Sequence, residues 1–241
     1  MIRAMIETSL VDWDGKITTV LFFDKCNFMC PFCQNWELMM KPGKFPPIEW
    51  QDIEAKLIAK KKWIDGVVLT GGEPFVFGEE VFSIGRKIKD LGFLLKIDTN
   101  GACPDELQRA VDDKLADYVA MDIKAPLDER YYVAAGVNVN IEKIKRSISQ
   151  LINGRVDYEF RTTCVPGLIN EETISAMGES IRGARSWILQ QYVPDNAYIE
   201  EYRNLAPVSA TDADKYLHTA RRYVPASKWR SKNADQEQNG H

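Results

Sequence analysis

The sequence predicts an α/β fold in a single domain, with its strands arranged as an incomplete (β/α)6 barrel. Two observations predict this fold: six short apolar or β-branched runs alternate with segments of helical character, and polar residues collect where the runs end. Alternation of this kind indicates a parallel sheet with crossover helices. An open doubly wound sheet would place its polar residues in the same way. Six units are too few for a closed eight-stranded barrel, so we expect a partial TIM barrel.

Each expected element follows from its own segment. The strands are expected at 17–23, 66–72, 93–101, 117–124, 157–167 and 186–194. The helices are expected at 49–63, 79–92, 104–115, 140–154 and 170–184. Pro104 suits a first helical turn, Asn140 and Asn170 are N-cap types, and Gly92 and Gly154 stand where a left-handed residue ends a helix.

Length and composition limit the domain organisation. The chain has 241 residues, of which 45% are hydrophobic, and this is enough to bury one sizeable core. We expect the domain to span residues 1–225. The end of the chain reads "SKNADQEQNGH" and has little to bury, so residues 226–241 are expected to be a disordered tail.

Charge and cysteine content restrict the partners. The formal net charge is -4, which gives no overall positive field to attract nucleic acid or an anionic lipid surface. No apolar run approaches the roughly 20 residues of a membrane span. Of the five cysteines, three are crowded together, while Cys103 and Cys164 stand alone. This pattern indicates a metal site in a reducing compartment, so we expect a soluble cytoplasmic protein.

The crowded cysteines form the most informative stretch. Cys26, Cys30 and Cys33 follow the spacing C-x3-C-x2-C in "FFDKCNFMCPFCQNW". A structural zinc site closes with four Cys or His ligands, and one of the isolated cysteines would have to fold back to complete it. An iron-sulfur cluster is the better fit, because a cubane held by three thiolates leaves one iron open.

The segment "LTGGEP" follows the next expected strand. Gly71 and Gly72 would let a ligand approach the backbone closely, and Glu73 would offer an acceptor to a ligand ammonium. A strand-to-helix turn with a solvated glutamate is the alternative.

Later strands also end in polar side chains. Asp98, Thr99 and Asp122 would converge at one mouth, where they could hold a hard cation or hydrogen-bond a ribose. Arg161 lies in a half-apolar strand, where its guanidinium must find an anion. The alternatives are a turn capped by Asp98 and an ion pair between Arg161 and an acidic neighbour on a strand.

The cysteine loop, with an aromatic residue (Phe32) before its last cysteine, resembles the radical S-adenosylmethionine superfamily. The resemblance implies a [4Fe-4S] cluster on Cys26, Cys30 and Cys33, with the open iron chelated by S-adenosylmethionine. It also implies one-electron reductive cleavage of that cofactor to methionine and a 5'-deoxyadenosyl radical.

The resemblance extends to the strand ends. In the superfamily a Gly-Gly-Glu segment matching 71–73 holds the methionyl amino group. In the subgroup that activates glycyl radical enzymes, residues matching Asp98, Thr99 and Asp122, with the Ala120 carbonyl, bind a monovalent cation beside the cofactor carboxylate. Asp98 and Asp122 are therefore expected on the cofactor side.

Three further residues are implied on the cofactor side. Arg161 matches the arginine of an Arg-x-x-x-x-Pro-Gly strand, and Asn35 matches the asparagine of a His-Asn pair that follows the cysteine loop. Lys124 matches a lysine that faces the cofactor or forms an ion pair with a neighbouring carboxylate.

The run "IETSLVDWDGKITTVLFFDKCNFMCPFCQN" most resembles the activating protein of the anaerobic (class III) ribonucleoside-triphosphate reductase, over about residues 5–195. Two positions depart from that pattern: Asp14 replaces a proline and Gln34 replaces a histidine. The family implies hydrogen abstraction from a backbone glycine of a partner glycyl radical enzyme, with an electron donor such as flavodoxin or ferredoxin. No side chain has to act as acid or base. A radical enzyme acting on a small molecule, like the 7-carboxy-7-deazaguanine synthases, and a zinc-binding interaction module remain as alternatives.

Overall fold

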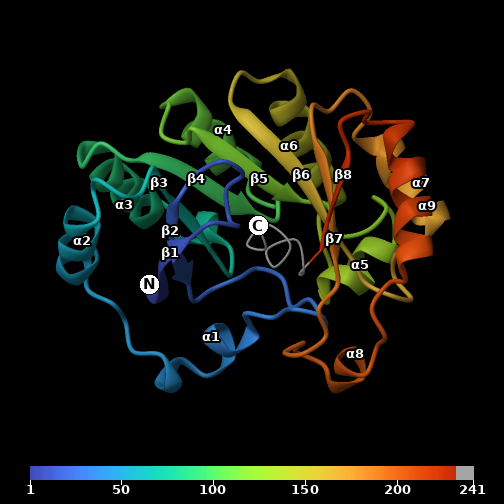
Figure 1. The fold of residues 1–241 in the computed structure, drawn as a ribbon, viewed down its shortest axis with the longest axis horizontal. Coiled ribbons are helices and arrows are strands. Elements are labelled where there is room, and N and C mark those ends of the chain that lie inside the picture. The colour runs from blue at the N-terminus through green and yellow to red at the C-terminus, as the bar shows by residue number, and fades with distance from the viewer. Residues whose placement is uncertain (232–241) are drawn as a thin grey trace, which may run out of the picture. The chain divides into compact units, whose positions relative to one another are not determined.

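The computed structural model describes residues 1–231 and has an α/β fold (Figure 1). Eight strands form one sheet in the order β1-β2-β3-β4-β5-β6-β7-β8. β1 (Ile2–Ser9) pairs antiparallel with β2, whereas the other pairings given below are parallel. Because the order is linear, β1 and β8 are the end strands within the described chain and the sheet is open. The predicted fold class is confirmed.

All six expected strands are present. They are β2 (Thr18–Phe23), β3 (Gly66–Gly71), β4 (Leu94–Thr99), β5 (Tyr118–Asp122), β6 (Asp157–Cys164) and β7 (Trp187–Gln191). The sequence analysis missed β1 and the three-residue β8 (Lys228–Arg230). β8 lies inside the segment expected to be a disordered tail, and the rest of that expectation, from 232 onward, lies outside the described residues.

The five expected helices are also present, and each is shorter than expected. They are α2 (Trp50–Ala59), α3 (Glu79–Asp90), α4 (Pro104–Asp112), α6 (Ile141–Asn153) and α7 (Glu171–Ser180). The helices α1 (Trp36–Met40), α5 (Arg130–Ala135), α8 (Glu200–Arg203) and α9 (Ala210–Arg221) and the 3-10 turns η1 (Pro42–Lys44) and η2 (Pro74–Phe77) were not expected. None of the described helices is both long and apolar enough to cross a membrane.

The residues pack into two compact units. Unit 1 comprises 1–27, 35–120 and 154–157, and unit 2 comprises 28–34, 121–153 and 158–241, of which the structure describes residues up to 231. The cysteine loop contributes to both: Cys26 belongs to unit 1, and Cys30 and Cys33 belong to unit 2.

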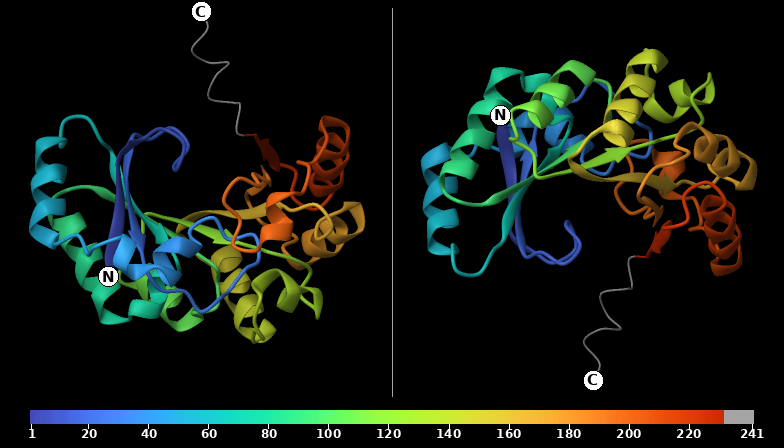
Figure 2. Two further views of the ribbon diagram at one scale, coloured as in Figure 1. Left: turned by 90° about the horizontal axis from the view of Figure 1, so that it is seen from below. Right: turned by 90° about the horizontal axis from the view of Figure 1, so that it is seen from above.

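Unit 1 is built on the parallel strands β2, β3 and β4. Val20 pairs with Val68 and Leu21 with Leu69, and none of these four side chains is exposed to solvent. Trp13 packs against Val20 and Val68. Helices α2 and α3 lie along one side of these strands (Figure 2). Full burial of each Val or Leu side chain contributes about 1.5–3 kcal/mol, so this core fixes the strand ends from which the polar residues project.

Unit 2 is built on the parallel strands β6, β7 and β8. Trp187 on β7 is fully buried, and its indole nitrogen donates to the Thr162 hydroxyl on β6 at 2.9 Å. Helix α7 starts with a capping box, in which Asn170 and Thr173 bond each other's backbone N–H groups. α7 and α9 lie beside the β7–β8 edge (Figure 1).

Gly136 brings helix α5 close to the cysteine loop within unit 2. It follows α5 with a φ of +67°, and a Cβ there would overlap the carbonyl oxygen of Met29. The Met29 N–H in turn donates to the Ala135 carbonyl at 2.8 Å. A left-handed glycine is therefore needed where the loop between Cys26 and Cys30 packs on the end of α5.

We expect Gly136→Ala to lower the free energy of unfolding by about 3 kcal/mol, from the left-handed conformation and from the overlap with Met29. Gly167→Ala is the matched control, because Gly167 has a φ of +83° but a Cβ added there would have no neighbouring atom within 4 Å. The control should lose only about 1–2 kcal/mol. Urea unfolding measures both, and equal losses would contradict a role for the Met29 contact.

Candidate active site

The Gly-Gly-Glu turn is locked to the start of the cysteine loop in unit 1. The Gly72 N–H donates to the Phe23 carbonyl at 2.9 Å, and the Glu73 N–H donates to the Lys25 carbonyl at 2.7 Å. A Cβ at Gly72 would overlap that Lys25 oxygen, so only glycine fits there. The turn after β3 therefore positions the backbone that leads into Cys26.

Glu73 has no solvent exposure, which corrects the alternative of a solvated glutamate. Its carboxylate accepts hydrogen bonds from the Thr99 hydroxyl at 2.9 Å, the Asn100 N–H at 2.6 Å and the Phe75 N–H at 3.2 Å. Burying a carboxylate is costly unless such donors are present. The end of β4 and the turn that carries Glu73 thus supply three donors to one acidic side chain.

Asn100 was not among the predicted site residues. Its side-chain nitrogen lies 2.7 Å from the Asn27 oxygen and 3.8 Å from the Cys26 sulfur. Asn27 also approaches the Cys103 sulfur, at 4.0 Å. Asn100 therefore connects the Glu73 carboxylate to the first cysteine. The signal for this role was its place beside Thr99 at the end of β4.

Asn35 lies beside the same turn. Its side-chain amide donates to the Gly71 carbonyl at 3.2 Å. Of the residues predicted on the cofactor side, Asn35, Gly71, Gly72, Glu73 and Asp98 all belong to unit 1.

Asp98 is paired with a buried lysine that the sequence analysis missed. Lys96 lies two residues earlier on β4, so both side chains project from the same face of the strand. Only 1% of Lys96 is exposed, and its ammonium nitrogen lies 3.5 Å from the Asp98 carboxylate. A lysine inside a strand gives no sequence signal of burial, because lysine is mostly exposed in proteins.

In unit 2, Asp122 at the end of β5 is held by two cations. The Arg161 Nε lies 2.9 Å from one carboxylate oxygen, and the Lys124 ammonium lies 3.3 Å from the other. Burial acts to raise the pKa of Asp122, but the charges of Arg161 and Lys124 outweigh it and hold the pKa below its ordinary value. The ion pair expected as the alternative for Arg161 is present.

The thiols of Cys30 and Cys33 belong to the same unit. The Cys33 N–H donates to the Cys30 carbonyl at 3.0 Å, so the two cysteines flank a tight turn. Burial raises the pKa of the Cys30 thiol to about 11, opposed by the nearby Lys124 charge. Binding to a metal centre as a thiolate would therefore release a proton.

Gln34 has a structural role next to Cys33. Its side-chain amide donates to the Val193 carbonyl at 2.6 Å, and Asn196 donates to the Gln34 backbone carbonyl at 2.9 Å. These bonds tie the end of the cysteine loop to the segment after β7.

The cysteine thiols are donors of the kind that an iron-sulfur cluster uses. None of the five cysteines forms a disulfide. No three His, Cys, Asp or Glu side chains of the described chain are grouped closely enough for a single metal ion. A cubane cluster does not need such a group, because each thiolate binds a different iron. In unit 1, the charges of Glu73, Asp98 and Lys96 add up to one negative charge. In unit 2, the charges of Asp122, Arg161 and Lys124 add up to one positive charge.

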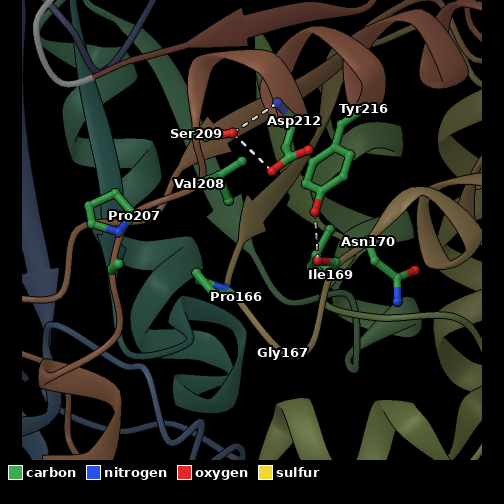
Figure 3. A pocket seen from close by; sticks show the side chains of 10 residues that line it. Pro166, Gly167, Ile169, Asn170, Pro207, Val208, Ser209, Asp212 and Tyr216 are labelled. Carbon is green, nitrogen blue, oxygen red and sulfur yellow. Dashed lines mark hydrogen bonds between the residues drawn. The ribbon is translucent and has the colours of Figure 1, made fainter.

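A cavity of about 370 Å³ lies elsewhere in unit 2 (Figure 3). It lies between the turn after β6 and the start of α9, and it is lined mainly by apolar residues. Tyr216 donates to the Ile169 carbonyl at 3.3 Å on its wall. None of the predicted site residues lines this cavity.

Comparison with known proteins identifies the relatives of this chain. The sequence pattern of the radical SAM superfamily matches residues 20–179. A protein of Methanocaldococcus jannaschii that bears the name glycyl-radical enzyme activating enzyme is 30% identical over 230 residues, or 93% of each chain. The pyruvate formate-lyase-activating enzyme of Clostridium pasteurianum is 29% identical over 197 residues, or 77% of each chain.

A solved structure supports the fold. A domain of the pyruvate-formate lyase-activating enzyme from Bacteroides vulgatus superposes with a TM-score of 0.54 at 18% identity, covering 68% of this chain and 98% of that domain. This similarity concerns the fold alone.

We expect Thr99→Val to lower the free energy of unfolding by about 1–2 kcal/mol, because Glu73 loses its hydroxyl donor in a buried place. Thr211→Val, at an exposed position on α9, is the matched control and should stay within about 0.5 kcal/mol of the parent. Denaturant unfolding of the cluster-free protein measures both. If Thr99→Val leaves the free energy of unfolding unchanged, the hydroxyl does not support Glu73.

Proposed function

The chain belongs to the radical S-adenosylmethionine superfamily, and on this premise we propose that it activates a glycyl radical enzyme. The observation that carries the proposal is the match over 93% of both chains to a protein named for this activity. The second match, to a pyruvate formate-lyase-activating enzyme over 77% of both chains, supports the same class of reaction.

The cofactors of this family are a [4Fe-4S] cluster and S-adenosylmethionine. When bound, they supply a 5'-deoxyadenosyl radical that removes a hydrogen atom from the α-carbon of a glycine in the partner. Cys26, Cys30 and Cys33 would hold the cluster through their three thiolates. None of the three forms a disulfide, so each thiol is chemically able to serve as a ligand.

The named ionic side chains differ in net charge between the two units. Glu73, on the turn bonded to the Lys25 carbonyl, would accept from the methionyl ammonium. Arg161 and Lys124 carry the excess positive charge of unit 2 and would face the methionyl carboxylate. Each of these groups is already oriented by hydrogen bonds or ion pairs within its own unit.

The partner we favour is the anaerobic ribonucleoside-triphosphate reductase. The run from Ile6 to Asn35 supports this choice through its resemblance to the activating protein of that enzyme. Gln34 is compatible with it, because its side chain supports the loop through Val193. A flavodoxin or ferredoxin would supply the electron. We place the protein in the cytoplasm, where free thiols persist.

Electron paramagnetic resonance tests the activity directly. The anaerobically reconstituted protein, incubated with S-adenosylmethionine, reductant and the purified reductase, should produce a carbon-centred doublet on the reductase. A reductase variant whose radical glycine is replaced by alanine is the control and should show no doublet. If 5'-deoxyadenosine is released with a small-molecule substrate and no partner protein ever carries a radical, the activase proposal is wrong.

A cysteine series tests the cluster assignment. Replacing Cys26, Cys30 or Cys33 by Ala should each abolish iron and sulfide binding, because a cubane needs all three thiolates. Cys103→Ala and Cys164→Ala are the controls and should keep the iron content of the parent. Cys103 is the sharper control, because it contacts Asn27 beside Cys26. Iron analysis after anaerobic reconstitution measures the series, and loss of iron in Cys103→Ala would mean that the ligand set is misassigned.

A further inference from the structure

The three residues expected to bind a monovalent cation already have partners inside the protein. Asp98 pairs with Lys96 in unit 1, at 3.5 Å. The Thr99 hydroxyl donates a hydrogen bond to Glu73 and accepts one from the Gly101 N–H at 3.1 Å. Asp122 lies between Arg161 and Lys124 in unit 2. Each carboxylate of the expected site therefore faces a protein cation.

Lys96 is an unusual partner for Asp98 because it is buried. Its side chain is 1% exposed, and a buried ammonium is tolerated only when an anion and further acceptors surround it. Asp98 is the anion. The backbone carbonyl of Asp12 accepts a hydrogen bond from the same ammonium. The ring of Tyr118 lies beneath the ammonium, with its centroid 5.7 Å away.

The surroundings of Lys96 are held from several sides. β4 fixes its backbone, because Val68 on β3 pairs with it in the sheet. Asp12 lies in the turn after β1, where its carboxylate accepts from the Ser9 hydroxyl. Tyr118 packs against Trp13 with ring centroids 5.6 Å apart. The ammonium is thus held in a fixed position beside Asp98, as a bound ion would be.

We infer that the Lys96 ammonium is the built-in counter-cation of Asp98, and that this enzyme binds S-adenosylmethionine without a monovalent metal cation. The inference rests on the proposed placement of Asp98 on the cofactor side. A potassium or sodium ion at Asp98 would face the Lys96 charge at close range, and this repulsion disfavours its binding. Lys96 is a positioning residue, since it acts on the cofactor through Asp98.

Affinity for S-adenosylmethionine in different salts is the first measurement. The reconstituted protein is titrated calorimetrically in potassium, sodium or choline chloride, each at about 0.15 M, so that screening is constant. We expect the Kd to differ by less than about twofold among the three salts. Binding at least about fivefold tighter in potassium than in choline would overturn the inference.

Lys96→Met removes the charge and keeps most of the side-chain length. In choline chloride it should weaken S-adenosylmethionine binding by about tenfold or more, and potassium or sodium should restore part of the affinity by taking the vacated place. Lys143→Met makes the same change at an exposed lysine and should behave as the parent in every salt. A Lys96→Met protein that binds the cofactor normally in choline would overturn the inference.

Thermal unfolding of the cluster-free protein gives a readout that needs no cofactor. The Tm of Lys96→Met should be lower than that of the parent and should rise with potassium relative to choline, because a bound ion stabilises the folded state. The double variant Lys96→Met with Asp98→Asn lacks both charges, so its Tm should not respond to potassium. If Lys96→Met does not fold, the double variant and the salt series on the parent still decide the question.

The outcome is separable from that of the activase experiment. Salt-independent cofactor binding without any glycyl radical on a partner would refute the proposed function and leave the role of Lys96 standing. A glycyl radical doublet together with potassium-dependent affinity for S-adenosylmethionine would support the proposed function and refute the role of Lys96.

Discussion

Unit 1 depends on the burial of one carboxylate. Glu73 is removed from solvent, so its charge must be met by donors within the protein. The Thr99 hydroxyl and the Asn100 N–H come from the end of β4, and the Glu73 N–H is itself bonded to the Lys25 carbonyl. The positions of β3, β4 and the start of the cysteine loop are therefore linked through a single residue, by its carboxylate and its backbone N–H. A shift of any one of these segments would leave buried hydrogen-bonding groups unpaired.

The two units handle buried carboxylates in different ways, and the difference matters for binding. Glu73 is surrounded by neutral donors, which stabilise its charge without cancelling it. Asp122 is surrounded by Arg161 and Lys124, which overcompensate its charge. Neutral donors thus preserve a negative site in unit 1, whereas cations create a positive site in unit 2. Within each unit, charges that are fixed in this way can meet a group of opposite charge without moving the side chains that hold them.

Much of the fold could be predicted from sequence because buried parallel strands have nearly continuous apolar sequences. The six predicted strands are of this type. β1 escaped because most of its residues are at least partly exposed, and β8 because three residues give no pattern. The short helices α5 and α8 lack the length over which a helical period can be detected.

Some residues of the candidate site could likewise be predicted from sequence, and others could not. Asp98 and Asp122 could be singled out because polar residues at strand ends stand out against apolar runs, and Arg161 because a guanidinium in a half-apolar strand needs an anion. Lys96 could not, because its burial depends on the Asp12 carbonyl and the Tyr118 ring, which the fold brings from distant parts of the sequence. Asn100 was missed for a similar reason: its contact with Cys26 joins residues that are 74 positions apart.

Position 34 shows how a departure from a family pattern can be compatible with its structure. The amide of Gln34 donates to the Val193 carbonyl, a bond that a histidine N–H could also make. Unlike histidine, glutamine makes this bond with a group that does not titrate. Histidine is the side chain whose charge ordinarily changes near neutral pH. With glutamine beside Cys33, the support of the loop does not depend on a protonation state, and the charge next to this thiol stays constant across the physiological pH range.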